Sequence, residues 1–491
     1  MAAPTETSPP TDTTVATPGV AEKRRTGRWI DDWRPEEPQF WAGGGAKIAR
    51  RNLIFSILSE HIGFSIWTMW SVLVLFMPAA AYGLTPDDKF LLTAVPAFVG
   101  AFLRLPYTFA VAKFGGRNWT IVSASLLLIP SILTAIVLKP GVSLTTLLVL
   151  AGLAGVGGGN FSSSMANINA FYPNRLKGAA LGLNAAGGNL GVAAVQLIGL
   201  IVLAGAGGVA ASVNPRLVPG IYIPLILVVT ACSALFMDNL SHASNDKRAM
   251  RDVIKEPHSW IMSLLYIGTF GSFIGFSFAL GRVLSQFLLP HHLPAGVTAA
   301  TAAPAVLKAA QAAASLDALK VIFLGPLLGS IARPAGGWLA DRWGGARITL
   351  ATFVGMGLFA GLVLVASQHK SLPLFYVGFT ALFILSGLGN GSTYKMIPAI
   401  FRAKAALNAG AGADLDWEAN EARRLSSALV GVAGAIGALG GALVQIVFRQ
   451  SFLTYKNADA AYLGFIGLYV VCFLVTWAVY LRNSPKKLVG V

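Results

Sequence analysis

The sequence predicts an all-α polytopic membrane protein whose twelve transmembrane helices form two pseudo-symmetric six-helix bundles. Three observations lead to this prediction. The 491-residue chain is 55% hydrophobic and only 12% charged, with a mean hydropathy of +0.65, whereas soluble proteins carry about 25% charged residues. Apolar stretches of about 20 residues, long enough to cross a bilayer as helices, follow one another along the chain. Finally, long motifs of the first half recur in the second.

We expect the twelve spans to be separated by short loops, and the basic residues of these loops predict which side each loop faces. The predicted spans are 53–78, 89–112, 118–138, 144–171, 177–203, 219–238, 259–288, 319–341, 347–367, 372–401, 425–448 and 460–481. With both termini in the cytoplasm, the cytoplasmic loops hold most of the basic loop residues: Lys113, Arg117, Arg175, Lys177, Lys247, Arg248, Arg251, Lys255, Arg342, Arg347, Arg402, Lys404, Arg423 and Arg424. We therefore predict a multi-pass protein of the cytoplasmic (inner) membrane with both termini inside.

The longest basic linker divides the chain into two halves. The predicted domains are a cytoplasmic N-terminal tail, a six-helix bundle, a cytoplasmic linker, a second six-helix bundle and a C-terminal tail, at 1–52, 53–238, 239–258, 259–482 and 483–491. The bundles repeat each other: 104-RLPYTFAVAKFGG-116 aligns with 333-RPAGGWLADRWGG-345, and 160-NFSSSMANINAF-171 aligns with 390-NGSTYKMIPAIF-401. Two parallel six-span halves are typical of secondary transporters of the major facilitator type, whose substrate site lies where the halves meet.

Other classes of function lack their signals. The net charge of +16 is explained by the basic loops, so we expect no nucleic-acid partner. The two cysteines lie in apolar stretches without metal-ligand spacing, and no nucleophile–base pair is apparent. We therefore predict no metal, no cofactor and no enzymatic activity. Residues 1–28 lack the apolar core of a signal peptide. The two-half architecture requires only a monomer.

The repeat places two arginines at equivalent positions in spans two and eight. Arg104 and Arg333 both occur within apolar sequence, where a charged side chain costs about 2.5–3.5 kcal/mol and normally faces a partner or water. Only one carboxylate, Glu60, lies well inside a predicted span. The missing negative charge could be the substrate, because a guanidinium fork suits a planar or tetrahedral oxyanion. The alternative is a structural role for both arginines at the cytoplasmic helix ends.

Small residues dominate spans five and eleven. Such residues allow helices to approach closely, and smooth faces also allow two bundles to move against each other. We assign packing or gating roles to residues of these two spans and of the loop after span eight: Gly182, Gly188, Gly191, Gly434, Gly437, Asp341 and Arg342. Two asparagines of span five, Asn184 and Asn189, have no counterpart in span eleven and need polar partners. Asn189 is a candidate substrate ligand, and Asn184 could equally pair with span four.

At this level of detail the chain resembles the nitrate/nitrite porters of the major facilitator superfamily. The similar segments cover nearly the whole chain: 178-GAALGLNAAGGNLG-191, 159-GNFSSSMANINAFYPNRLKGAALGLN-184, 265-LYIGTFGSFIGFSFAL-280, 386-SGLGNGSTYKMIPAIF-401 and 32-DWRPEEPQFW-41. The resemblance implies transport of nitrate and nitrite by alternating access. It implies that Arg104 and Arg333 grip the anion, that Phe161, Tyr266 and Phe270 sandwich it, and that Asn189 is the asparagine of the nitrate signature.

The mode of coupling depends on ionisable residues inside the spans, which indicate function by default. Glu60 either takes up a proton together with nitrate, which gives symport, or forms a structural ion pair with Lys395 of span ten, which fits nitrate/nitrite antiport. The first span resembles the proton-coupled branch of the family, so the prediction favours symport. The alternative is a carrier with a different substrate: another small oxyanion, an organic anion or phosphate. The Ala-rich insertion 289–318 is expected to form a helical cap of unknown purpose.

Overall fold

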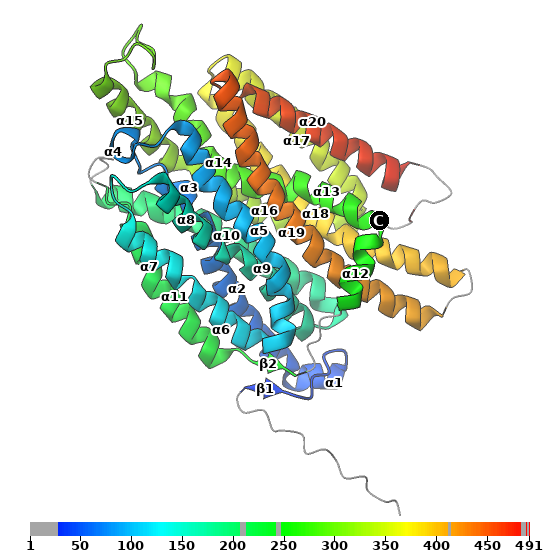
Figure 1. Ribbon diagram of the computed structural model, residues 1–491. Helices are drawn as coiled ribbons and strands as arrows, with labels where there is room; N and C mark the ends of the chain where they lie inside the picture. The colour runs from blue at the N-terminus through cyan, green and yellow to red at the C-terminus, as the bar shows by residue number, and fades with distance from the viewer. Residues whose placement is uncertain (1–27, 207–212, 242–246, 411–413, 483–487, 489–490) are drawn as a thin grey trace, which may run out of the picture.

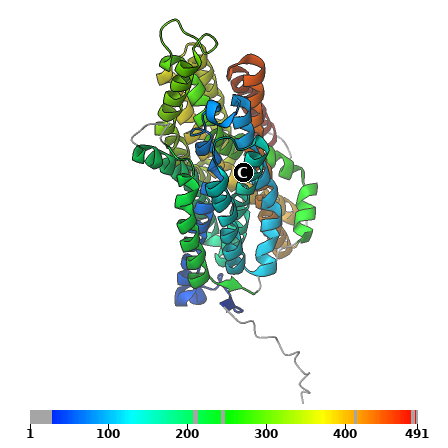
Figure 2. The same ribbon diagram turned by 60° about the vertical axis from the view of Figure 1, so that its left-hand side comes forward.

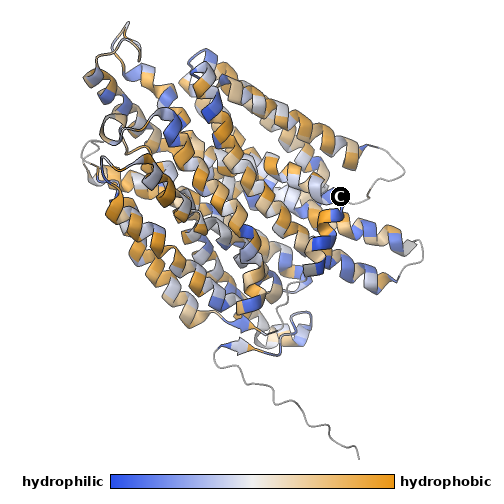
Figure 3. Cartoon of the chain, viewed as in Figure 1, coloured by the Kyte–Doolittle hydropathy of each residue, from blue (hydrophilic) through white to orange (hydrophobic). Residues whose placement is uncertain are grey.

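The computed structural model describes residues 28–206, 213–241, 247–410, 414–482, 488 and 491. Parts of the predicted tails 1–52 and 483–491, and of the linker 239–258, lie outside this range. The described chain is a bundle of long helices that run roughly along one direction (Figures 1 and 2). Hydrophobic residues cover most of the helix lengths, and hydrophilic residues gather around α12 and the adjoining ends of α18 and α19 (Figure 3).

The helices of the first half follow the predicted spans closely. They are α1 (Pro38–Phe40), α2 (Ala46–Thr68), α3 (Trp70–Leu73), α4 (Ala79–Tyr82), α5 (Pro86–Phe114), α6 (Gly116–Leu126), α7 (Leu128–Val137), α8 (Leu144–Ala154), α9 (Val156–Phe171), α10 (Asn174–Gly205) and α11 (Leu217–Phe236), with a π-helical turn, Trp41–Gly45, after α1. Three predicted spans are interrupted at a single residue, Met69, Leu127 or Gly155. Each of these residues donates its N–H to the carbonyl three positions earlier, so the helix tightens locally but continues.

The helices of the second half run longer than predicted. They are α12 (Lys247–Lys255), α13 (Pro257–Tyr266), α14 (Ser272–Leu288), α15 (Pro304–Ile322), α16 (Leu324–Trp343), α17 (Gly345–Gln368), α18 (Leu372–Gly410), α19 (Leu415–Tyr455) and α20 (Asp459–Thr476), with π-helical turns at Ile267–Gly271 and Trp477–Leu481 and a 3₁₀ turn, Leu289–His292. The greatest extension at a single end is at the start of span eight, where α15 leads directly into α16. The second part of the insertion 289–318 is therefore helical, as expected from its alanines.

Eleven of the described helical segments are long and apolar enough to cross a membrane. The predicted first span is not among them, because α2 carries Arg50, Arg51, Glu60 and His61. It nevertheless lies within the bundle, where it packs against α9, α10 and α11. From Ile62 to Thr68 every residue is buried, so α2 faces protein more than lipid and needs less hydrophobicity than its neighbours.

The two halves meet at two helix–helix contacts, and the repeat relates one contact to the other. Helix α5 packs against α19, and α10 packs against α16. One end of the molecule carries a short parallel ladder in which β1 (Trp29–Ile30) pairs with β2 (Asn239–Leu240). We call this the ladder end, and the end that carries α4 and the start of α15 the opposite end (Figure 1).

The ladder end is reinforced by an ionic cluster around one aspartate. Arg28 and Arg51 both pair with Asp238, at 3.0 and 2.5 Å, and Asn52 donates to the same carboxylate at 2.9 Å. Asp238 is 5% exposed, so these partners compensate for the charge that is removed from water. The segment before the first span is thereby tied to the end of α11.

Candidate functional site

Arg104 lies on α5 at the contact between the two halves and is completely buried. Its Nε donates to the carbonyl of Gly158 on α9 at 3.2 Å, and its Nη1 donates across to the carbonyl of Gly434 on α19 at 2.7 Å. Its Nη2 has no hydrogen-bond partner among the described residues. Arg104 therefore bridges the halves while keeping one donor free.

Arg333 occupies the equivalent position on α16 and is 3% exposed. Its Nη2 donates to the Tyr266 hydroxyl at 3.2 Å, and its guanidinium carbon lies 5.5 Å from the ring centre of Tyr394. Its Nη1 is buried and has no partner in the part of the chain that the structure describes. Each half thus contributes one arginine with one unsatisfied N–H group, which is costly in a buried site unless a ligand accepts from it.

Aromatic rings lie against both guanidiniums. The ring centre of Phe161 is 4.4 Å from the guanidinium carbon of Arg104 and 6.0 Å from that of Arg333. Phe270 is 5.0 Å from Arg104 and stacks on Phe161 at 6.1 Å and on Tyr266 at 5.2 Å. These distances fall in the range of cation–π contacts. The two arginines and three aromatic residues singled out in the sequence therefore form one cluster.

The glycines of spans five and eleven differ in how closely they are packed. A Cβ atom would lie 2.2 Å from Glu60 Oε1 at Gly188, 2.0 Å from the His61 carbonyl oxygen at Gly191 and 2.5 Å from the Tyr266 ring at Gly437. At Gly434 it would lie 3.4 Å from Phe161 and 3.7 Å from Arg104 Nη1. These four positions bring helix backbones up to the site. At Gly182 a Cβ atom would meet nothing within 4 Å.

This difference gives a matched pair of substitutions on α10. Gly191→Ala should destabilise the protein by about 1–3 kcal/mol, because the added methyl group collides with a backbone carbonyl of α2 that cannot move alone. Gly182→Ala should leave stability unchanged or raise it slightly, because alanine favours helix. Thermal unfolding of the purified variants in detergent checks this, and equal melting temperatures for the two would contradict the packing described here.

Asn189 is fully buried, and neither its amide nitrogen nor its amide oxygen has a partner among the described residues. Asn184, which precedes Asn189 on the same helix, does pair with span four: it donates to Ser164 of α9 at 2.9 Å. An unsatisfied buried amide costs free energy comparable to a lost hydrogen bond. Both amide atoms of Asn189 therefore remain available to a ligand or a water molecule, whereas Asn184 has its nitrogen bonded and only its oxygen without a partner among the described residues.

Glu60 is completely buried on α2. Its Oε2 accepts from the Ser164 hydroxyl and from the Asn184 amide, the latter at 2.7 Å. Its Oε1 has no partner in the described chain. Glu60 also interacts electrostatically with Arg333 and Arg104, so the site contains two cations and one carboxyl group.

The predicted alternative of a Glu60–Lys395 ion pair is wrong. Lys395 of α18 pairs with Asp341 at the end of α16, at 2.7 Å. This ion pair joins two helices of the same half. Because Asp341 is mostly exposed, the pair contributes little to stability. Arg342 contacts the rings of Trp338 and Trp343. Among the described residues, neither Asp341 nor Arg342 forms a hydrogen bond or ion pair with the arginine cluster.

Several neighbours of the arginines were not singled out from the sequence. Phe64 and Trp67 of α2 place their ring centres 5.9 and 5.3 Å from Arg104, and Tyr394 of α18 lies beside Arg333. Asn160 and Asn390 begin the two copies of the second repeated motif, and both are buried with neither amide atom partnered among the described residues. Their matching positions in the repeat were the signal that could have identified them.

The two ends of the molecule differ in how the halves contact each other. Toward the opposite end, Thr93 of α5 donates to Gln445 of α19 at 3.0 Å, and Gln196 of α10 donates to the Ser277 carbonyl of α14 at 3.0 Å. Phe90 stacks on Phe452 across the same interface at 5.5 Å. Toward the ladder end, residues of α5, α9, α12 and α19 line a cavity of about 460 Å³. The halves therefore contact each other closely toward the opposite end, whereas toward the ladder end a cavity lies between them and Asn169 of α9 still donates to Ser427 of α19 at 3.5 Å.

Comparison with known proteins places this arrangement in a family. Residues 62–413 match the Major Facilitator Superfamily. The chain belongs to this superfamily. It is therefore a multi-pass membrane transporter and not an enzyme. In agreement with the fold, a bacterial homologue of the human lysosomal transporter Spinster, in an inward-facing and occupied conformation, superposes with a TM-score of 0.59 at 15% identity, covering 88% of this chain and 98% of that one.

Relatives at higher identity cover almost the full length. The chain is 36% identical to the nitrate/nitrite transporter NarU of Salmonella typhimurium, over 93% of this chain and 97% of that protein. It is 30% identical to the probable nitrate/nitrite antiporter NarK2 of Thermus thermophilus, over 95% and 99%. The resemblance to nitrate/nitrite porters drawn from the sequence is thereby confirmed.

Proposed function

We propose that this superfamily member carries nitrate, and also nitrite, across the cytoplasmic membrane by alternating access. The observation that carries the proposal is the pair of buried arginines, Arg104 and Arg333, each with one unsatisfied N–H group. A single oxyanion between the halves can accept from both donors and neutralise part of their charge. Closure around the anion would then be favoured, because without it the two cations repel each other.

Nitrate suits this site better than a larger or protonated oxyanion. It is flat, monovalent and without a proton to lose, and the rings of Phe161, Phe270 and Tyr266 offer flat apolar walls beside the guanidiniums. Asn189 adds an unpartnered amide donor on α10. The names of the full-length relatives, a nitrate/nitrite transporter and a nitrate/nitrite antiporter, support the same substrate. The carrier of another small oxyanion remains the alternative outcome of the experiment below.

The orientation follows from the basic loops. We place the ladder end in the cytoplasm, because the loops at this end hold most of the basic residues. With that orientation, the cavity between α5, α9, α12 and α19 opens toward the cytoplasm and the closed contacts around Thr93 and Phe90 face outward. The described conformation is then closed toward the outside, and the cavity lies on the cytoplasmic side of the two buried arginines.

We propose proton-coupled symport, with Glu60 as the proton acceptor. When Glu60 is ionised, its carboxylate and nitrate compete for the same two arginines. When Glu60 is protonated, that competition disappears and nitrate binds more tightly. By linkage, nitrate binding must favour protonation to the same extent. The free Oε1 of Glu60 can hold the proton while Oε2 keeps its bonds to Ser164 and Asn184.

Nitrate/nitrite exchange is the second candidate, and the name of the Thermus thermophilus relative favours it. In that case Glu60 is a structural carboxylate that partly neutralises the arginines. Nitrate and nitrite then cross the membrane one at a time in opposite directions, and each anion in turn neutralises the positive charge of the two arginines.

One experiment separates these functions. Purified protein is placed in liposomes, and nitrate uptake is measured with an inward proton gradient, with and without nitrite inside. Uptake driven by the proton gradient alone is expected. Uptake that requires internal nitrite and ignores pH would establish exchange instead. Uptake of neither anion under any condition would overturn the nitrate proposal, and flux of phosphate or another oxyanion would then name the substrate.

A further inference from the structure

A second group of cations lies at the opposite end of the molecule, on helices that also lead to the arginine cluster. Lys89 of α5 and Arg282 of α14 are 7% and 8% exposed. They come from different halves of the molecule and line the same cavity of about 90 Å³. Its lining also includes Lys308, Gln311 and Ser315 of α15 and Ser285 of α14, and no Asp or Glu.

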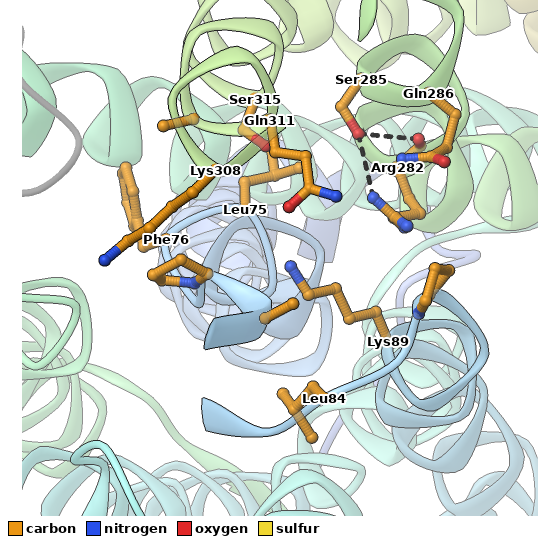
Figure 4. A pocket seen from close by; sticks show the side chains of 14 residues that line it. Leu75, Phe76, Leu84, Lys89, Arg282, Ser285, Gln286, Lys308, Gln311 and Ser315 are labelled. Carbon is orange, nitrogen blue, oxygen red and sulfur yellow. Dashed lines mark hydrogen bonds between the residues drawn. The ribbon is translucent and has the colours of Figure 1, made fainter. Parts of the chain in front are cut away.

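The two buried cations point into this cavity. Figure 4 shows the Lys89 amine and the Arg282 guanidinium directed into the space below Gln311. Arg282 donates only weakly to Ser285, at 3.5 Å, and Gln286 can accept from its Nη1 at 2.7 Å when the amide is turned to present oxygen. Its Nε has no partner in the described chain. Ser285 and Gln286 are neutral, so they accept hydrogen bonds from Arg282 without neutralising its positive charge.

Nearby carboxylates do not fill the cavity. Asp87 interacts electrostatically with Arg282, but it is not among the residues that line the space. Asp317 pairs with Lys320 at 2.7 Å and with His292 at 3.0 Å. Two buried cations from different helices without a lining carboxylate are costly unless an anion or water joins them.

Helix α15 completes the cavity with a polar strip. Lys308, Gln311 and Ser315 follow at spacings of three and four residues, which places them on one helix face. The rest of the helix is rich in alanine. The insertion 289–318, whose purpose the sequence did not reveal, thus supplies one wall of a cationic pocket, near the ends of α3 and α14 and the start of α5.

We propose that this pocket is a second binding site for a small monovalent oxyanion, at the entrance that faces away from the ladder end. The inference rests on the proposed nitrate function for the identity of the anion. Its role is to concentrate nitrate or nitrite at the outer mouth before the halves open there. A cleft lined by charges of one sign raises the local concentration of the oppositely charged ligand and its association rate by tenfold or more.

The transport test measures each side of the membrane separately. Lys89→Gln and Arg282→Gln should each raise the KM for nitrate supplied from the outer side by about tenfold, with a much smaller change in KM from the cytoplasmic side. Lys89→Arg, which keeps the charge, should restore most of the outer affinity. Gln311→Glu, which adds a carboxylate of the same size to the wall, should act in the same direction as the charge removals. Lys320→Gln is the matched control, because Lys320 is an exposed cation of α15 outside the pocket.

A binding measurement distinguishes failure of the pocket from failure of the transport proposal. In the Arg333→Gln background, nitrate compared with gluconate at equal ionic strength should still raise the melting temperature of the purified protein, and adding Lys89→Gln should remove that rise. If wild type transports neither anion but this pattern holds, the transport proposal fails and the pocket stands. If Lys89→Gln and Arg282→Gln change neither the outer KM nor the nitrate-dependent melting temperature, the pocket is not an anion site.

Discussion

Arg333→Gln should reduce nitrate uptake into liposomes by about a hundredfold, because a hydrogen bond to a buried charged group contributes about 1.5–3 kcal/mol. The substitution removes the donor Nη1, which has no partner in the described chain, and one of the two charges of the cluster. Arg333→Lys should recover little of the activity, because an ammonium group cannot present a planar fork of donors. The measurement is the initial rate of uptake over a range of nitrate concentrations.

The two arginines should also behave alike, since the repeat relates them. Arg104→Gln should lose as much uptake as Arg333→Gln, and it should additionally loosen the contact with the Gly434 carbonyl across the halves. Arg175→Gln is the matched control, because Arg175 is an exposed arginine at the start of α10. Near wild-type uptake by either cluster variant, with nitrate as the only anion, would exclude that arginine from the substrate site.

Glu60→Gln should abolish the dependence of nitrate uptake on pH while leaving exchange intact. Glutamine resembles the protonated carboxyl in shape and charge, so nitrate can still bind to the two arginines. It cannot release or take up a proton, so an inward proton gradient should no longer drive uptake. In wild type, the rate should rise as the external pH falls, and in the variant it should be flat.

The control for this variant is a second buried carboxylate outside the cluster. Glu418 of α19 is 7% exposed and accepts from Asn408 at about 3 Å, and Glu418→Gln should preserve the pH dependence. If Glu60→Gln loses nitrate/nitrite exchange as well as proton-driven uptake, while its folded yield equals that of wild type, the carboxylate is needed for more than proton transfer. If its proton-driven uptake persists, Glu60 is not the coupling residue.

The sequence predicted the fold class because a bilayer imposes simple rules on a chain. Apolar segments must be about 20 residues long, and their backbone groups must be satisfied within helices. These rules located the helices, and the repeated motifs divided them into two halves. Helix ends were less well predicted: α15, α18 and α19 extend beyond their apolar segments, since helix propensity continues where the membrane requirement ends.

The candidate site could be assembled largely from the repeat and the family resemblance. Arg104 and Arg333 came from equivalent motifs, and Phe161, Tyr266 and Phe270 came from the resemblance. What a linear pattern could not show was which polar groups are already satisfied. Asn184 is bonded to Ser164 and Glu60 whereas Asn189 is not, although both belong to the same glycine-rich segment.

By itself, then, the sequence determined a two-half helical membrane protein with an unbalanced pair of internal arginines, because hydrophobicity and repetition are properties of the chain in one dimension. Only the tertiary structure decided the partners. Lys395 pairs with Asp341 and not with Glu60. Lys89 of one half and Arg282 of the other line one cavity, together with residues of α15. Electrostatic interactions depend on distance through space, whereas the partners are far apart along the chain: Lys395 and Asp341 are 54 residues apart, and Lys89 and Arg282 come from different halves.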